Sequence, residues 1–269
     1  MASKPKILVT NDDGIYSAGI YALYNAMAEI GEAFVVAPDT ERSAVGHAIT
    51  ISDPLRVFEI ERNGKFFGWA VNGTPADCVK LGVKGILQFI PDLIVSGINQ
   101  GSNTATNVIY SGTVSAATEG TIMGIPSVAF SLTTFRKTDF SFAAEIARYV
   151  ASKVLEKGLP EGILLNVNIP PVTAEEFRGI KITRQGKGRY EEAFEKRVDP
   201  ANRTYYWLGG TKLLLDTDDD IDEVAVINNY VSVTPLQYDL TDRKMMGLLQ
   251  EWGMESDSLK PGAGKVNRQ

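Results

Sequence analysis

The stretch "ILVTNDDG", Ile7–Gly14, begins the fold and carries its first candidate site. Four apolar or β-branched residues predict a buried strand, and this run then ends on an amide, two adjacent acids and a glycine. "SAGIYALYNAMAEI" (17–30) follows with the spacing of a helix, and "AFVVAP" (33–38) indicates a second buried strand. A strand, a helix and a strand in this order predict a parallel βαβ unit.

The same alternation continues along the chain to residue 170. We expect helices over 74–86, 111–124 and 139–158, and strands over 91–99, 125–132 and 162–170. Thr74, followed by proline at the first helical position, is a suitable N-cap for the first of these helices. Uniformly hydrophobic strands alternating with helices predict a three-layer α/β fold, in which helices cover both faces of a mostly parallel sheet.

The pattern changes after about residue 180. "ITRQGKGRYEEAFEKRVDP" is charged, while "RTYYWLGGTKLLL" and "NNYVSVTPL" are typical of strands. We therefore divide the chain into an α/β core (1–180), a C-terminal β-rich arm involved in oligomer contacts (181–254) and a disordered tail (255–269). The acidic run "DTDDDIDE" fails as an EF-hand, since Ile221 occupies the glycine position, so we expect a solvated loop there.

Composition excludes several classes of function. The chain has 269 residues and a net charge of −6, and no basic block suggests a nucleic-acid polymer as partner. The sequence has one cysteine, Cys78, and shows neither a signal-peptide pattern nor an apolar run of bilayer length. These features favour a cytoplasmic protein that does not engage membranes. With one histidine, His47, a metal would be held mainly by oxygen, which favours Mg²⁺, Mn²⁺ or Ca²⁺.

Polar residues follow three of the predicted strands. Asp12 and Asp13 come after the first strand, Ser43 and His47 after the second, and Asn99 ends the third. Ligands of open α/β sheets bind beyond the carboxyl ends of the strands, so these side chains are expected to meet. Adjacent carboxylates repel unless something neutralises them, and a divalent cation does so directly. The alternative is that one acid caps the turn while the other faces solvent.

A second informative segment, "YSGTVSAATEG", begins a helix after a glycine-bearing loop. Ser111, Gly112 and Thr113 stand at the helix start, where free N–H groups and the helix dipole favour an anion such as phosphate. Asn103 adds a neutral donor nearby. The alternative is that Ser111 or Thr113 is simply an N-cap. His47 is either a general acid or phosphate donor, or a packing residue at the edge of the site.

Two other classes of function compete with a metal-dependent enzyme. Aspartyl-nucleophile phosphatases carry D-x-D-G-T, whereas the two acids here are adjacent and do not both face a site from an extended strand. A non-catalytic module that binds a metal and a nucleotide is the other alternative. The chain has neither the G-x-G-x-x-G pattern of dinucleotide-binding folds nor a P-loop.

Five motifs in this order resemble the survival protein SurE family of metal-dependent nucleotidases: "ILVTNDDGI", "VVAPDTERSAVGHAIT", "VNGTPADCVKLG", "DLIVSGINQGSN" and "YSGTVSAATEG". The resemblance runs from about residue 6 to about residue 240. It implies a Rossmann-like α/β domain with a C-terminal arm exchanged between subunits of a homodimer or homotetramer. It also implies hydrolysis of nucleoside 5′- and 3′-monophosphates, and in some members of short polyphosphate, with one divalent cation, Mg²⁺ or Mn²⁺.

The resemblance also implies roles for individual residues. The metal ligands correspond to Asp12, Asp13, Ser43 and Asn99, and the phosphate contacts to Asn103, Ser111, Gly112 and Thr113. Asn11 and His47 are additional candidates. Our hypothesis is direct attack by a water bound to the cation, oriented or deprotonated by Asp12 or Asp13, without a covalent intermediate.

Overall fold

The computed structural model describes residues 3–136, 139–173 and 175–254. The described chain forms two compact units, one ending at Tyr238 and the other beginning at Asp239. None of the described helices combines the length and the apolar character needed to cross a bilayer.

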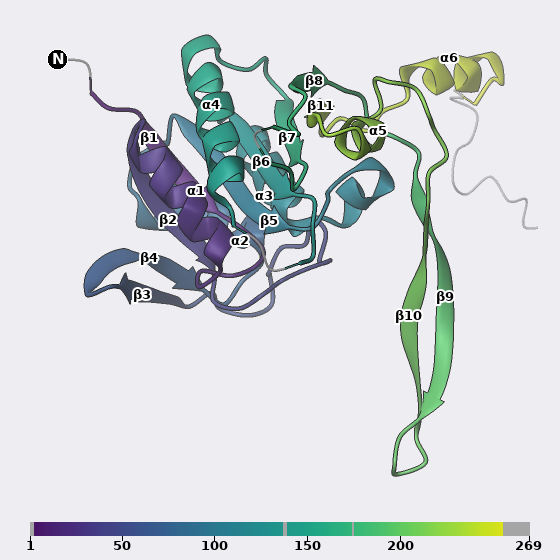
Figure 1. The fold of residues 1–269 in the computed structure, drawn as a ribbon, viewed down its shortest axis with the longest axis horizontal. Coiled ribbons are helices and arrows are strands. Elements are labelled where there is room, and N and C mark those ends of the chain that lie inside the picture. The colour runs from purple at the N-terminus through teal and green to yellow at the C-terminus, as the bar shows by residue number, and fades with distance from the viewer. Residues whose placement is uncertain (1–2, 137–138, 174, 255–269) are drawn as a thin grey trace, which may run out of the picture. The chain divides into compact units, whose positions relative to one another are not determined.

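The first unit is built on a nine-stranded sheet in the order β3-β4-β2-β1-β5-β6-β7-β11-β8 (Figure 1). The strands are β1 Lys6–Thr10, β2 Glu32–Pro38, β3 Val57–Arg62, β4 Lys65–Val71, β5 Leu93–Gln100, β6 Ser127–Leu132, β7 Ile163–Ile169, β8 Ile180–Ile182 and β11 Val231–Gln237. The six neighbouring strands β4, β2, β1, β5, β6 and β7 run parallel to one another. β3 pairs antiparallel with β4, and β11 pairs antiparallel with β7. The predicted mostly parallel sheet is therefore confirmed.

Helices cover both faces of this sheet. They are α1 Ala18–Ala28, α2 Pro75–Leu81, α3 Gly112–Ile122, α4 Ser141–Lys157 and α5 Asp222–Ile227, with a π-helical turn η1 Gly82–Ile86 and a 3₁₀ turn η2 Ala105–Tyr110. α1 and α4 pack together on one face, and α2 and α3 pack together on the other (Figure 1). The predicted three layers are confirmed, although the helix expected over 74–86 changes from α to π geometry after Leu81.

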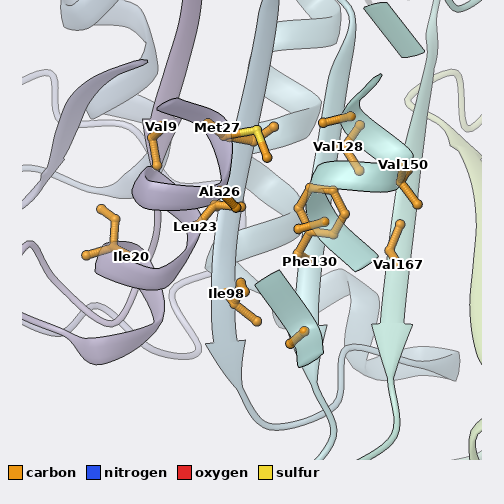
Figure 2. Close-up of a cluster of buried hydrophobic side chains, with 14 of the residues drawn as sticks. Val9, Ile20, Leu23, Ala26, Met27, Ile98, Val128, Phe130, Val150 and Val167 are labelled. Carbon is orange, nitrogen blue, oxygen red and sulfur yellow. The ribbon is translucent and has the colours of Figure 1, made fainter. Parts of the chain in front are cut away.

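The larger core lies between the sheet and the α1–α4 layer (Figure 2). Ile20, Leu23 and Met27 of α1 are fully buried at helical spacing, and Phe130 of β6 fills the centre of the layer. Burying each such side chain contributes about 1.5–3 kcal/mol. The Ser17 hydroxyl caps α1 by accepting a hydrogen bond from the Ile20 N–H at 3.3 Å.

Close packing brings the start of α1 against the end of β5. A methyl group on Gly19 would overlap the carbonyl oxygen of Ile98. Only a residue without a side chain allows this approach. Gly19 therefore fixes the distance between the first helix and the strand that carries Asn99.

The predicted arm contains a separate two-stranded antiparallel hairpin, β9 Arg189–Val198 and β10 Thr204–Leu213 (Figure 1). Every residue of β9 is exposed, as is nearly all of β10. β8 and β11, from the same part of the sequence, pair with the main sheet instead. The boundary that we place at residue 180 stays a prediction.

The acidic run 216–223 is only partly a solvated loop. Arg184 pairs with two of its exposed aspartates, as a surface loop would allow. Asp222 and Glu223, however, are buried at the start of α5, so the expectation of a solvated loop is wrong for both. Asp222 accepts three backbone N–H bonds, and the Oε1 atom of Glu223 pairs with the Lys212 ammonium group.

The second unit contains helix α6, Arg243–Glu251. The Asp242 carboxylate caps it by accepting a hydrogen bond from the Met245 N–H at 2.9 Å. Asp239 also pairs with Arg243 at 2.7 Å. The tail over 255–269, which the sequence predicts to be disordered, lies outside the described residues.

Candidate metal and phosphate site

The order of the strands assembles the candidate site. β1 lies between β2 and β5 in the sheet. The order of the strands reverses here, so the loop after β1 begins at a topological switch point. The loop after β2 folds back over this point, and the Arg42 N–H donates to the Asp12 carbonyl oxygen at 2.7 Å. The Gly46 N–H donates to the Tyr110 carbonyl oxygen at 3.0 Å, so the same loop also reaches the end of η2.

Asp12 is buried against the start of α3. The Thr113 hydroxyl donates to its Oδ1 at 2.6 Å. Gly112 stands so close to this side chain that a Cβ there would lie 2.7 Å from the Asp12 Cβ. Burial raises the pKa of Asp12, and the hydrogen bond from Thr113 opposes that shift. Among the described residues, the carboxylate therefore has one side-chain donor, Thr113, and no ion pair with a lysine or an arginine.

Asp13 is less enclosed than Asp12. Its Oδ2 accepts a hydrogen bond of 3.3 Å from the Gln100 N–H at the end of β5. Burial, followed by the negative charge of Asp12, raises the pKa of Asp13 to about 7. Asp13 therefore gains much from a nearby cation.

Ser43 and Asn99 are brought to the same place. The Ser43 hydroxyl donates to Glu41 at 2.8 Å, which leaves its oxygen lone pairs for another partner. The Asn99 side chain donates its N–H to the Gly101 carbonyl oxygen at 2.9 Å. The side-chain Oδ1 atom of Asn99 accepts no hydrogen bond within the described part of the chain. The Ser43 hydroxyl and the Asn99 amide can therefore each offer an oxygen to a ligand.

These four residues fit a divalent cation. No lysine or arginine side chain pairs with Asp12 or Asp13 among the described residues. In the same residues, no group of three or more histidine, cysteine, aspartate or glutamate side chains forms a metal site. A cation here would therefore take two carboxylates, a hydroxyl and an amide oxygen, a donor set suited to Mg²⁺ or Mn²⁺.

Asn103 is fixed by a network of buried amides. Its side chain donates to the Ser131 hydroxyl at 2.8 Å, and its N–H donates to Asn168 Oδ1 at 2.9 Å. Its carbonyl oxygen accepts from Asn166 and Asn168 at 2.8 and 3.0 Å. The sequence analysis did not identify this support. The signal was two asparagines two residues apart in an otherwise apolar strand, "LLNVNIP", which places both on one face of the sheet.

Ser111 is the N-cap of α3. Its hydroxyl accepts a hydrogen bond from the Val114 N–H at 3.1 Å. The helix start expected at 111–113 is therefore present, and its first N–H groups lie beside Asp12. The Thr113 hydroxyl donates to Asp12, so this side chain holds the carboxylate in place.

The two additional candidates lie at the periphery. The Asn11 side chain donates to the Gly14 carbonyl oxygen and to Ser17, so it shapes the turn after β1. His47 Nε2 lies 2.9 Å from the buried carboxylate of Glu119, which Lys80 also contacts at 2.5 Å. Burial favours the neutral form of Glu119, but the bonds to His47 and Lys80 outweigh it and lower the pKa.

One cavity of about 580 Å³ unites half of the predicted residues. Its wall contains Asp12, Ser43, Asn99, Asn103 and Ser111. Asn11, Asp13, His47, Gly112 and Thr113 are not part of that wall. The volume is within the range of small-molecule sites and leaves room beyond a phosphate group.

The hairpin forms another side of this cavity, a contribution that the sequence analysis did not assign to individual residues. Tyr190, Glu192, Leu208, Gly209 and Gly210 line it. Alternation along β9 places Tyr190 and Glu192 on one face, but nothing in the sequence shows which face turns towards the sheet.

Comparisons with known proteins agree with this geometry. The sequence profile of the family described as "Survival protein SurE" matches residues 7–192. "5'-nucleotidase SurE" of Syntrophobacter fumaroxidans is 51% identical over 249 residues, which cover 93% of this chain and 100% of the relative. The protein of the same name from Chlorobium phaeobacteroides is 51% identical over 252 residues, which cover 94% and 98%.

A solved structure gives the same result. The crystal structure of the SurE protein from Aquifex aeolicus superposes with a TM-score of 0.81 at 44% sequence identity. The match covers 93% of this chain and 100% of the other. The family profile covers more than half of the chain, and these relatives are about half identical to nearly all of it, so the chain belongs to the SurE family.

Proposed function

We propose that the chain is a divalent-metal-dependent 5′-nucleotidase that hydrolyses nucleoside monophosphates to nucleoside and phosphate. The names of its relatives support the reaction class. The observation that carries the proposal is one cavity that joins a buried, uncompensated carboxylate, Asp12, to the start of α3 at Ser111. The proposal extends to nucleoside 3′-monophosphates and to short polyphosphate, which carry the same terminal phosphoryl group.

The cation-binding residues are Asp12, Asp13, Ser43 and Asn99, and the cation is one Mg²⁺ or Mn²⁺. Such an ion, when bound, lowers the pKa of water and neutralises charge on phosphoryl oxygens. Thr113 holds the Asp12 carboxylate through a 2.6 Å hydrogen bond, so Asp12 approaches the site in one orientation.

The phosphate group lies between Asn103 and the start of α3. The Ser131 hydroxyl positions the Asn103 side chain. Gly112 and Thr113 are the first residues of α3, and the amino end of a helix favours negative charge.

The reaction is a direct displacement. An attacking water forms the new P–O bond, the bond to the nucleoside oxygen breaks, and the nucleoside leaves with a proton. Asp13 orients or deprotonates the water, because among the described residues its carboxylate accepts a single hydrogen bond, of 3.3 Å from the Gln100 N–H. No aspartyl phosphate forms.

Self-association and location complete the proposal. Phe194, Tyr206 and Trp207 are more than half exposed on the hairpin, and an isolated two-stranded hairpin is marginally stable in water. We expect the hairpin to pack against another copy of the chain in a homodimer or homotetramer. We also expect a cytoplasmic location, in agreement with the single, buried Cys78.

The test is phosphate release from a panel of nucleoside monophosphates. EDTA should abolish release, Mg²⁺ or Mn²⁺ should restore it, and Asp12→Asn should lose it. Asp92→Asn is the matched control, since Asp92 lies at the amino end of β5 and accepts from Lys6. Binding of nucleotide without release would indicate the non-catalytic module, and a trapped phospho-aspartate would indicate the aspartyl-nucleophile class.

A further inference from the structure

The hairpin presents one defined face to the cavity. Leu208 pairs with Phe194 and Gly210 with Glu192 in the antiparallel register. Two residues that pair directly across the hairpin share a face, and so do residues two positions apart on the same strand. Tyr190, Glu192, Leu208 and Gly210 therefore lie on the same face, and all four line the cavity.

Buried contacts hold the base of the hairpin against the phosphate-site loop. The Lys212 ammonium lies 2.6 Å from the buried Glu223 carboxylate and donates to the Thr104 hydroxyl at 3.2 Å. The Thr106 hydroxyl donates to the Gly188 carbonyl oxygen at 2.8 Å. The wall formed by the hairpin is thus tied to the residues directly after Asn103.

Part of the wall is aromatic and apolar. Tyr110 and Phe135 are 59% and 80% exposed, and Tyr190 and Leu208 add apolar surface from the hairpin. Exposed aromatic rings in the wall of a cavity provide stacking surfaces for a flat π-system. A nucleobase is the part of a nucleoside monophosphate that has such a surface.

Glu192 is the charged group on the hairpin side of this wall. No lysine or arginine belongs to the wall among the described residues. An ionised carboxylate only accepts hydrogen bonds, so it requires donors from its ligand. Gly210 pairs with Glu192, and a Cβ on Gly210 would lie only 2.5 Å from the Glu191 carbonyl oxygen, so the two strands approach closely at this point.

We propose that Tyr190, Glu192 and Leu208 form the nucleobase subsite, and that Glu192 selects guanine. Guanine offers two adjacent donors, N1–H and N2–H, which match the two oxygens of a carboxylate. Adenine places an acceptor beside its single donor, and uracil places acceptors on both sides of its donor. The inference rests on the proposed function for the identity of the ligand.

The experiment compares kcat/KM for GMP, AMP, CMP and UMP, together with ribose 5-phosphate, which has no base. The same ligands are measured as Kd by calorimetry, so base selection is tested even where turnover is absent. The variant is Glu192→Gln. Its control is Glu191→Gln, since Glu191 is the neighbouring exposed residue on the opposite face of β9.

The native enzyme is expected to prefer GMP over UMP by about tenfold. Glu192→Gln should lower the GMP-to-AMP ratio by about tenfold, because a glutamine can both accept from N6 and donate to N1 of adenine. Glu191→Gln should keep the native order. Equal affinity for all four bases, or an unchanged order in Glu192→Gln, overturns the subsite. If no nucleotide is hydrolysed but the Kd values still show the expected preference for GMP, only the proposed function is overturned.

Discussion

Asp13→Asn removes the carboxylate whose protonation the fold perturbs most clearly. Burial and the charge of Asp12 raise its pKa from 3.8 to about 7. Because the folded state holds the proton more tightly, stability is fully present below the unfolded pKa and falls as pH rises towards 7. Linkage over pH 5 to 8 gives a loss of about 2.7 kcal/mol, which partial solvation reduces to about 1–2 kcal/mol.

The assay is urea denaturation of EDTA-treated protein at pH 5 and pH 8. Between pH 5 and pH 8, the free energy of unfolding of the native chain should fall by about 1–2 kcal/mol more than that of Asp13→Asn, by the same linkage. Asp92→Asn should behave like the native chain. Saturating Mg²⁺ or Mn²⁺ at pH 8 should stabilise the native chain but not Asp13→Asn, since a ligand stabilises only the state that binds it. Equal losses in the native chain and Asp13→Asn would refute the reasoning.

Three further substitutions test the packing around the site. Thr113→Val removes the one side-chain donor to Asp12 among the described residues and should lower the free energy of unfolding by about 1.5–3 kcal/mol, with a parallel fall in kcat/KM; an unchanged Tm would contradict the contact. Lys212→Met leaves Glu223 buried and unpaired, and should cost about 2 kcal/mol that Lys212→Met/Glu223→Gln largely restores. Gly19→Ala should cost about 2 kcal/mol in chemical denaturation, because the methyl group overlaps a backbone carbonyl of β5.

The layers of the fold could be predicted because local patterns determine them. The apolar run before Asn11 and the helical spacing of Ile20, Leu23 and Met27 depend on neighbouring residues alone, and the structure confirms both elements. The N-cap at Thr74 is also a local feature, and the structure confirms it.

Features that depend on distant residues were harder to predict. Asp222 and Glu223 lie in an acidic run whose composition indicates solvent, yet each is buried because partners from other segments satisfy it. The position of the hairpin face against the cavity likewise depends on contacts such as Lys212 to Thr104, separated by 108 positions. The roles of the ten candidate site residues stay predictions, although the structure places five of them in one wall.

The most direct test of the central claim is a titration of metal-free enzyme with Mn²⁺. Calorimetry counts the bound ions while phosphate release from a nucleoside monophosphate is followed in the same samples. The account predicts that release rises in proportion to one ion bound per chain and is absent before any ion binds. Full release without metal, or saturation with Mn²⁺ and no release, would contradict it.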